Sequence, residues 1–532
     1  MAASSTDLDA IVVGAGFSGL YALHKLKNAL GLQSRILEKA DGIGGTWYAN
    51  RYPGALSDSE SYLYCYASDR DHIPDSYLAW RYVRQPQVLA YLADFAARHD
   101  LLGHIELNTT VVAAHFEEES ATWRVVNHLG ENLSCKYLIL GTGALSASIG
   151  PELDNIDSFT GEILYTSNWP ADYSLAGKRV AVMGTGSTGS QLITACADDV
   201  ESLVVLQRTS QYLVPLGNRQ RSAEEVRSIK GGYAEIWKEL HESPLAFGFE
   251  MSEIPAMSVS AAERERIFER VWNYGGPYNF MFGTFSDITT DPEANEAAAA
   301  FIRRKIAATV KDPATAEKLT PAELWARRPV AGSGYYEVFN QENVILEDVR
   351  TNPIESVEPH GLRMSNGHLH ELDVIVFATG FDAFEGSYVR IDIHGIDDRI
   401  LKEYWADVPR GYLGMSVSGF PNMFTVYGPN SSFSNNPTVI ETQVDWIKDA
   451  IRYAQANGIS TMDVSPSAEN DWYATCDELI QETLFPKVKS WIFGYNVKGK
   501  SSATRTYVGG LKKFRRILDE ESGAGYPSYA KE

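Results

Sequence analysis

The sequence lacks the features that mark several large classes of protein. Its 532 residues include four cysteines, Cys65, Cys135, Cys196 and Cys476, with no CxxC pair and no zinc-site spacing to histidine. This pattern predicts buried free thiols in a reducing compartment and no metal site. No apolar run reaches the roughly 18 residues that a transmembrane helix needs. The first residues do not show the basic and apolar regions of a signal peptide, so we expect a cytoplasmic protein.

Positive charge is also scarce. The chain carries 47 lysines and arginines against 69 aspartates and glutamates, for a formal net charge of -22. Such a surface repels phosphate backbones and anionic lipids, so we predict neither a nucleic-acid nor a membrane partner. An anionic ligand would need a local cluster of arginines or helix N-termini.

What the sequence does contain is the pattern of a large α/β protein. Hydrophobic residues make up 44% and charged residues 22%, as in ordinary globular enzymes, and the length predicts two or three domains. The strand, glycine turn and helix of LDAIVVGAGFSGLYALHKL recur in GKRVAVMGTGSTGSQLITACA. Two further apolar strands end in similar turns, LILGTGAL at 138–145 and VIVFATGFDA at 374–383. Alternating strands and helices predict parallel sheets.

Each glycine loop follows an apolar strand and opens a helix, which is the context that dinucleotide binding requires. The first glycine makes the turn, the second admits a pyrophosphate, and the third lets helix and strand pack closely. The helix N-terminus then faces the negative charge. The predicted contacts are Gly14, Gly16, Phe17, Ser18 and Gly19 in the first loop and Gly184, Thr185, Gly186, Ser187, Thr188 and Gly189 in the second.

The two loops differ at the position nineteen residues after the last glycine, which is Glu38 in the first and Arg208 in the second. A carboxylate there accepts hydrogen bonds from ribose hydroxyls and repels a 2′-phosphate, whereas an arginine pairs with that phosphate. The first site therefore predicts FAD and the second NADPH, as in a flavoprotein that NADPH reduces. The alternative for both residues is ordinary surface charge.

The predicted fold class is α/β, with two Rossmann-like dinucleotide-binding domains and a helical insertion. Residues 1–145 and 388–532 form the FAD domain, and residues 146–221 and 331–387 form the NADPH domain. Residues 222–330 are helical by periodicity and are predicted to be a helical subdomain within the NADPH domain. One of its helices has Asp291 as the expected N-cap and Pro292 at the first helical position.

Two stretches resemble the paired fingerprints of type I Baeyer–Villiger monooxygenases: GGTWYANRYPGALSD at 44–58 and FTGEILYTSNWP at 159–170. The resemblance covers nearly the whole chain. It is closest to the cyclohexanone monooxygenase group through RRPVAGSGYYEVFNQENV, GPNSSFSNNPT and LFPKVKSWIFGYN. It implies that NADPH reduces FAD and that the flavin captures O₂ as a C4a-peroxide. That peroxide converts a ketone, of small or medium ring size, to an ester or lactone while NADP⁺ stays bound.

The resemblance also implies site residues. Arg328, in the RRP of 327–329, matches the catalytic arginine of the family, and Asp58 matches the acid that positions it. A guanidinium keeps its proton, so it can hold a peroxide anion charged and stabilise a tetrahedral adduct. The alternative for Asp58 is a loop N-cap. Arg327 matches a position that contacts the NADPH 2′-phosphate together with Arg208 and Thr209.

Further cofactor and substrate positions follow from the same resemblance. Trp491, in KSWIFG, matches a tryptophan on the nicotinamide ribose side of the site, with an ordinary core tryptophan as the alternative. The expected FAD contacts beyond the first loop are Glu38, Lys39, Gly44, Gly45, Thr46, Trp47, Asp58 and Tyr64. The apolar candidates for the ketone pocket are Phe247, Phe280, Phe433 and Trp491, and each could equally be a core residue.

One fingerprint position departs from the family. The pattern FxGxxxHxxxW, followed by Pro or Asp, is met at Phe159, Gly161, Trp169 and Pro170, but Tyr165 occupies the histidine position. A phenol with a pKa of about 10 does not change charge near neutral pH, as an imidazole does. We therefore interpret the stretch as a domain linker that acts as a hinge and latch, and we expect oxygenation to be retained.

Other functions remain open at this point. One is an NADPH oxidase that releases hydrogen peroxide because the altered latch exposes the flavin. Another is a flavin monooxygenase of nitrogen or sulfur, against which the predicted pair of Arg328 and Asp58 counts. A non-enzymatic flavin-binding protein would leave the arginines unexplained. The predicted partners are a small ketone and O₂, and the predicted assembly is a monomer or a weak homo-oligomer.

Overall fold

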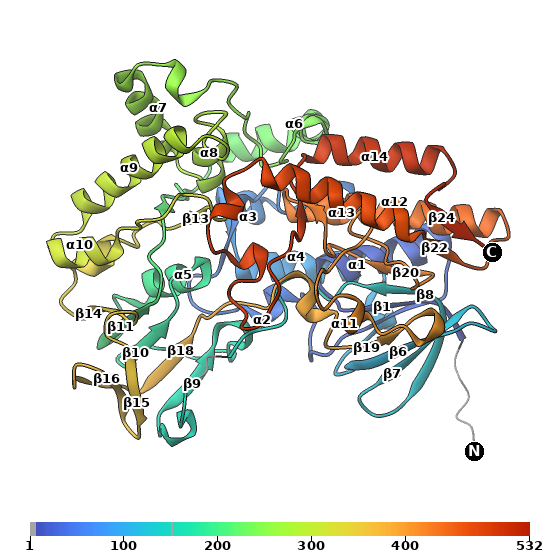
Figure 1. Cartoon of the computed structure of the whole chain (residues 1–532), viewed down its shortest axis with the longest axis horizontal. Coiled ribbons are helices and arrows are strands. Elements are labelled where there is room, and N and C mark those ends of the chain that lie inside the picture. The colour runs from blue at the N-terminus through green and yellow to red at the C-terminus, as the bar shows by residue number, and fades with distance from the viewer. Residues whose placement is uncertain (1–6, 151–152) are drawn as a thin grey trace.

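The computed structural model of the protein describes residues 7–150 and 153–532. Two sheets dominate it, a larger one on the right of Figure 1 and a smaller one on the left. The larger sheet contains β1 (Asp7–Val13), β2 (Ser34–Leu37), β5 (Ile105–Glu106), β6 (Val111–Glu117), β7 (Thr122–Asn127), β8 (Asn132–Leu140), β19 (Asp392–His394) and β20 (Met423–Thr425). Their order is β19-β6-β7-β8-β1-β2-β5, and β20 pairs with β8.

The smaller sheet is parallel throughout. It contains β9 (Glu162–Tyr165), β10 (Arg179–Met183), β11 (Ser202–Gln207), β14 (Val344–Asp348) and β18 (Val374–Phe377), in the order β14-β11-β10-β18-β9. β1 and β10 are the strands that run into the two glycine loops, and each lies inside its sheet. The larger sheet is mixed: β7 pairs antiparallel with β6 and β8, and its other pairs are parallel. Two sheets built largely of parallel strands, each with a glycine loop, confirm the predicted α/β class.

The third glycine of each loop shows why no side chain fits there. A Cβ atom on Gly19 would lie 1.7 Å from the Gly14 carbonyl oxygen, and one on Gly189 would lie 2.0 Å from that of Gly184. α1 (Phe17–His24) and α5 (Ser187–Cys196) can therefore begin directly against the turns. Both helix N-termini then lie where a bound pyrophosphate would lie.

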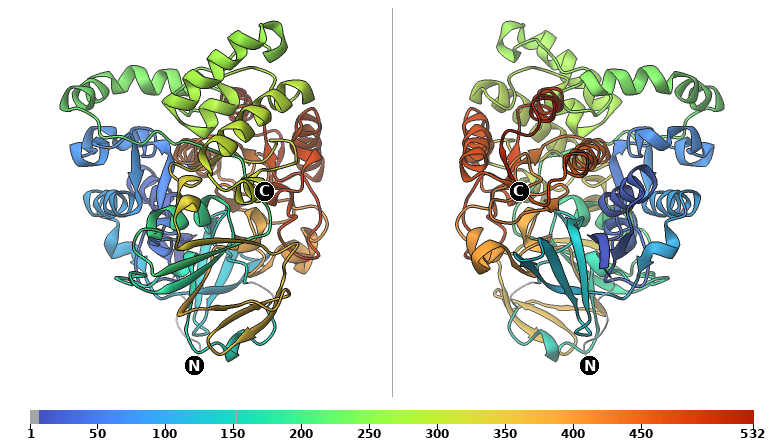
Figure 2. Two further views of the ribbon diagram at one scale, coloured as in Figure 1. Left: turned by 90° about the vertical axis from the view of Figure 1, so that its left-hand side faces the viewer. Right: turned by 90° about the vertical axis from the view of Figure 1, so that its right-hand side faces the viewer.

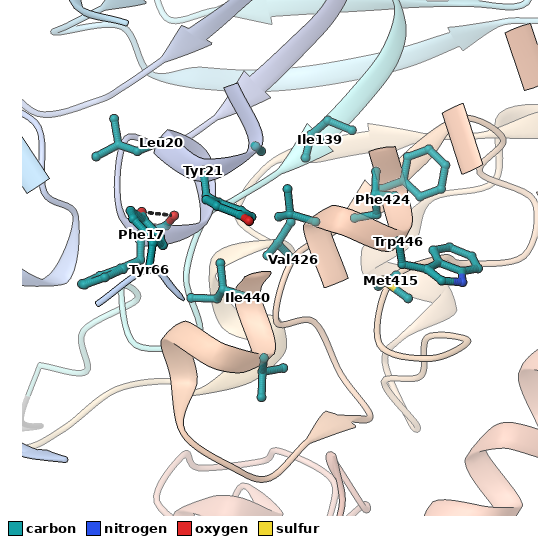
Figure 3. Close-up of a cluster of buried hydrophobic side chains, with 14 of the residues drawn as sticks. Phe17, Leu20, Tyr21, Tyr66, Ile139, Met415, Phe424, Val426, Ile440 and Trp446 are labelled. Carbon is teal, nitrogen blue, oxygen red and sulfur yellow. Dashed lines mark hydrogen bonds between the residues drawn. The ribbon is translucent and has the colours of Figure 1, made fainter. Parts of the chain in front are cut away.

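The N- and C-terminal parts of the chain share one core (Figure 3). Tyr21 and Tyr66 come from the first part, and Phe424 and Trp446 come from the last. The Tyr66 hydroxyl donates a hydrogen bond of 2.6 Å to the carbonyl oxygen of Phe17. Helices around this core and the larger sheet are α2 (Thr46–Ala49), α3 (Asp75–Leu78), α4 (Gln85–Arg98), α11 (Leu401–Tyr404), α12 (Asn436–Ala456), α13 (Pro466–Gln481) and α14 (Leu511–Gly523).

The helical insertion divides between two cores. Its helices are α6 (Ala223–Glu242), α7 (Ala261–Tyr274), α8 (Pro277–Phe282), α9 (Pro292–Thr309) and α10 (Pro313–Leu319), and α7 and α9 stand at the top of both views in Figure 2. α7 to α10 bury side chains in the core that also holds α5. α6, however, buries Tyr233 and Trp237 in the core of the larger sheet, against Phe514 of α14. α6 therefore packs on the core of the larger sheet, whereas α7 to α10 pack on the core that holds α5.

Local signals in the insertion agree with the structure. The Asp291 carboxylate accepts hydrogen bonds of 2.9 Å from the backbone N–H groups of Glu293 and Ala294, which confirms it as the N-cap of α9.

Smaller sheets complete the fold. The two-stranded ones pair β3 (Leu56–Glu60) with β4 (Tyr82–Arg84), β12 (Leu213–Val214) with β13 (Val330–Ala331), β21 (Ser431–Ser432) with β23 (Thr506–Tyr507), and β22 (Met462–Val464) with β24 (Tyr529–Lys531). A three-stranded sheet contains β15 (Ile354–Glu358), β16 (Gly361–Met364) and β17 (Leu369–Glu371).

The four cysteines are free and buried, as predicted. Burial raises the pKa of each thiol above its ordinary value. Across residues 7–150 and 153–532, no helix is both long enough and apolar enough to cross a bilayer.

Candidate functional site

The first glycine loop is joined to the carboxylate that follows β2. Glu38 is buried, and its side-chain oxygens accept hydrogen bonds from the backbone N–H groups of Ala15, at 2.6 Å, and Ala40, at 2.8 Å. A carboxylate has lone pairs beyond these two, so ribose hydroxyls can still donate to it. Lys39, the next predicted contact, is exposed.

The GGTW stretch lies against this loop. A Cβ atom on Gly45 would lie 2.9 Å from the Cα atom of Gly16, so the two glycines keep the backbones in close contact. Gly45 is followed by α2, in which Thr46 is exposed and Trp47 is buried. The Trp47 indole donates a hydrogen bond of 3.1 Å to the Tyr64 hydroxyl. The glycines, the aromatic wall and the helix N-terminus form a backbone cradle that fits the pyrophosphate and flavin of FAD.

Residues 52–58 reach from this cradle to the second nucleotide unit. The Tyr52 hydroxyl donates a 2.8 Å hydrogen bond to the side-chain oxygen of Gln191 in α5. A Cβ atom on Gly54 would lie 2.6 Å from the Gln191 carbonyl oxygen, so only glycine allows this approach. The fingerprint thus joins the two domains as well as lining the flavin cradle, and Gln191 was not found from the sequence.

The second glycine loop ends beside an exposed arginine. Arg208 directly follows β11, and none of the described residues offers its guanidinium a hydrogen bond or an ion pair. The Thr185 hydroxyl in the loop donates a 2.9 Å hydrogen bond to the carbonyl oxygen of Thr209. A free cation beside a helix N-terminus fits the 2′-phosphate of NADPH.

Arg328 lies where the two units meet. Its guanidinium forms an ion pair with Asp58 and donates a 3.0 Å hydrogen bond to the Ser187 hydroxyl at the start of α5. Asp58 lies on β3 in the flavin fingerprint, so the arginine connects the FAD side to the NADPH side. Burial lowers the pKa of Arg328, but Asp58 and the nearby Tyr278 outweigh it and hold that pKa above its ordinary value. The guanidinium therefore stays charged.

Aromatic rings border this charge pair. The guanidinium carbon of Arg328 lies 5.6 Å from the ring centre of Tyr278. Phe247 stacks on Tyr278 with ring centroids 4.1 Å apart, and the ring centroid of Phe433 lies 6.4 Å from that of Tyr278. A small hollow is lined by Asp58, Phe247 and Tyr278, among others. Tyr278, which the sequence reasoning missed, thus lies between the charge pair and the apolar wall.

Phe280 does not join this wall. Its ring lies 5.4 Å from that of Phe268 and 5.7 Å from that of Phe301, inside the core of the insertion, and it is fully buried. Two residues along a helix turn by about 200°, so Tyr278 and Phe280 point to opposite sides of α8. The structure therefore places Phe280 in the core of the insertion, whereas Tyr278 lines the hollow beside Asp58.

The C-terminal segment around Trp491 lies beside Arg327. Trp491 stacks on Phe384 with centroids 5.9 Å apart and is partly buried. The Arg327 side chain donates a 3.0 Å hydrogen bond to the Lys489 carbonyl oxygen and is paired with Glu323. Arg327 is thus held by Lys489 and Glu323, and its expected contact with a 2′-phosphate stays a prediction.

The FTGEILYTSNWP stretch is only partly a linker. Residues 162–165 form β9, the edge strand of the smaller sheet, in register with β18 so that Tyr165 faces Phe377. The Tyr165 ring lies 5.3 Å from the Phe377 ring and the residue is 38% exposed. Gly161 is fixed by space, because a Cβ atom would lie 2.4 Å from the Asp373 carbonyl oxygen. Phe159 is buried in the core of this sheet.

Only the second half of the stretch spans the domains. Trp169 is buried, and its backbone N–H donates a 3.2 Å hydrogen bond to the Ala49 carbonyl oxygen at the end of α2. Pro170 follows it and is exposed. Trp169 therefore fastens the NADPH side to the helix that carries Trp47.

Known proteins provide independent findings. The family model "Flavin-binding monooxygenase-like" matches residues 9–219. A cyclohexanone 1,2-monooxygenase of an Acinetobacter species is 47% identical, over 98% of this chain and 96% of its own. A phenazine N-monooxygenase of Lysobacter antibioticus is also 47% identical, over 98% of this chain and 97% of its own. The crystal structure of a Rhodococcus cyclohexanone monooxygenase bound to NADP⁺ superimposes with a TM-score of 0.97, at 47% identity, covering 99% of this chain and 100% of that one.

Proposed function

Because this chain belongs to the Baeyer–Villiger monooxygenase family, and so converts ketones to esters or lactones with FAD, NADPH and O₂, we propose that Arg328 is the cation at which the reaction takes place. The observation that carries this proposal is the placement of Arg328 between Asp58 of the flavin fingerprint and Ser187 of the second glycine loop. No other arginine among the described residues bridges the two.

Bound FAD, once reduced by NADPH, supplies the activation of O₂. The role of the protein at that centre is electrostatic. The Arg328 guanidinium remains protonated and stabilises the negative charge that develops on the ketone oxygen. Asp58 holds the guanidinium in a fixed orientation, so that little reorganisation is needed during the reaction. Tyr278 presents a hydroxyl beside the same charge, and Phe247 provides an apolar surface for the ketone.

The cofactor specificity rests on Glu38 and Arg208. Glu38 is fastened under the first glycine loop and accepts hydrogen bonds, which fits ribose hydroxyls and excludes a phosphate. Arg208 is exposed and has no partner among the described residues, so a 2′-phosphate would give it one. We propose that Thr209 adds a contact at the same end of β11.

The reaction is tested by its stoichiometry. With a cyclic ketone such as cyclohexanone, NADPH consumption should depend on the ketone, and the ester or lactone should form in equal amount. Consumption that ignores the ketone and yields hydrogen peroxide would identify an oxidase instead. Small and medium cyclic ketones are the proposed substrates, because the hollow beside Asp58 is small and one side of it is aromatic.

Nitrogen oxidation is a second candidate, and the likeness to a phenazine N-monooxygenase favours it specifically. The Arg328–Asp58 pair is the observation against it, because oxidation of a heteroatom uses the protonated form of the oxidant and needs no fixed cation beside it. Competition between a cyclic ketone and an aromatic nitrogen heterocycle, with both products measured, decides between them. A product ratio that favours the N-oxide would make nitrogen oxidation the principal activity.

We also propose that the protein works in the cytoplasm, as a monomer or a weak homo-oligomer. Four free buried thiols support a reducing compartment. Sedimentation velocity over a range of protein concentrations tests the assembly, and a concentration-independent dimer would contradict it.

A further inference from the structure

Two histidines face each other at the outer edge of the larger sheet, far along the sheet from β1 and its glycine loop. β19 is the edge strand, and it pairs in parallel with β6 in a register that sets His394 opposite His115 (Figure 1). Their ring centroids are 4.6 Å apart and their planes are inclined by 30°. Opposed residues on paired strands project to one face, so both imidazoles reach the same point.

Carboxylates complete this cluster. Asp398, in the turn after β19, places Oδ1 2.5 Å from the Nδ1 atom of His394. Asp392 places Oδ1 3.0 Å from the Nε2 atom of the same ring, although that contact is not aligned as a hydrogen bond. His115, His394 and Asp398 each offer one ligand atom, and these three atoms lie within 4.8 Å of one another. His394 is 14% exposed at its side chain and the two aspartates are more open, so solvent ions can reach the cluster.

The donors suit a particular class of ion. Two imidazoles and a carboxylate are typical of zinc and related transition metals, whereas magnesium and calcium prefer oxygen ligands alone. Zinc bonds of about 2.0–2.2 Å in a tetrahedron need ligand atoms roughly 3.3–3.6 Å apart, which small side-chain rotations can supply here. A histidine that binds a metal through one ring nitrogen usually donates a hydrogen bond from the other ring nitrogen to a carboxylate. His394 has a carboxylate beside each ring nitrogen.

We propose that His115, His394 and Asp398 bind a divalent transition-metal ion of the zinc class, with Asp392 positioning the His394 ring and water completing the coordination. The ion would tie β19 and its turn to β6, where the C-terminal part of the chain rejoins the larger sheet. Sequence spacing predicted no metal site, because these donors become neighbours only when β6 and β19 pair.

The test is a calorimetric titration of untagged, FAD-loaded enzyme with zinc chloride at pH 7. The expected result is one saturable site per chain of roughly micromolar affinity. Thermal unfolding should shift upward with zinc, and excess chelator should reverse the shift. Absence of saturable binding would overturn the proposal.

Variants locate the site. His115→Ala and Asp398→Asn should each weaken zinc binding by at least about 10-fold, and Asp392→Asn by roughly 10-fold through lost positioning. His104→Ala removes a histidine elsewhere and should leave the affinity unchanged. Flavin content and ketone-dependent NADPH consumption confirm that each variant is folded, with His115→Gln as a substitute if alanine is not tolerated. Wild-type affinity in both His115→Ala and Asp398→Asn would place any bound zinc elsewhere.

Discussion

Replacing Arg328 by alanine removes a cation that contacts both Asp58 and Ser187. A preorganised charge at a developing oxyanion is worth about 10²–10³ in rate, or about 2.7–4 kcal/mol. The side chains of Arg328 and Asp58 are 24% and 20% exposed to solvent, so water can partly replace the lost contact. We therefore expect product formation to fall by roughly 10²–10³-fold and the free energy of unfolding to fall by about 1–3 kcal/mol.

The assay separates the two half-reactions. Under anaerobic conditions, NADPH should still reduce the flavin of Arg328→Ala, because Arg208 and the backbone N–H groups of the second glycine loop remain in place. In air, ester formation should be lost while NADPH is still consumed and hydrogen peroxide accumulates. Arg328→Lys keeps the charge but loses the planar fork, so it should recover only part of the activity.

A matched control distinguishes this effect from loss of any arginine. Arg304 lies on α9 and pairs with Glu265 on the surface of the insertion. Arg304→Ala should keep both product formation and flavin reduction. If Arg328→Ala retained near-normal ester formation, the electrostatic argument would be refuted and another group would have to supply the charge.

The remaining predictions concern single contacts. Arg208→Ala should weaken NADPH use by roughly 10–100-fold and leave NADH use nearly unchanged, because a charge-assisted contact is worth about 1.5–3 kcal/mol; equal losses in steady-state kinetics with both cofactors would remove Arg208 from phosphate recognition. Tyr278→Phe should keep flavin reduction but lower kcat/KM for the ketone by roughly 5–10-fold, since one neutral hydrogen bond is lost; an unchanged value would make Tyr278 a packing residue only. Tyr165→His should be tolerated, whereas Tyr165→Ala should release more hydrogen peroxide per NADPH because the contact with Phe377 is lost; an inactive parent that Tyr165→His activates would contradict the latch.

The sequence predicted those features that depend on local backbone chemistry. Glycines at 14–19 and 184–189 report a turn that only glycine can make, and the carboxylate or arginine after the next strand lies at a fixed distance from that turn. Asp291 as an N-cap is likewise a local signal. These features need no knowledge of how distant segments pack.

Features that depend on long-range packing were missed or misplaced. Periodicity identified α6 as a helix but carried no information on which of two apolar cores it would join. Phe280 is a pocket candidate by its aromatic character alone, and only the direction of α8 shows that Phe280 faces the core while Tyr278 faces the hollow. Gln191 gave no signal at all, because its role arises from contact with the fingerprint of another domain.

The most direct measurement of the central claim uses isotopically labelled oxygen. Turnover of a cyclic ketone under ¹⁸O₂ with NADPH should give a lactone that carries one ¹⁸O atom, in the ring position beside the carbonyl carbon. The amount of labelled lactone should match the NADPH consumed. Unlabelled lactone, or labelled hydrogen peroxide with no lactone from any ketone tested, would contradict the account.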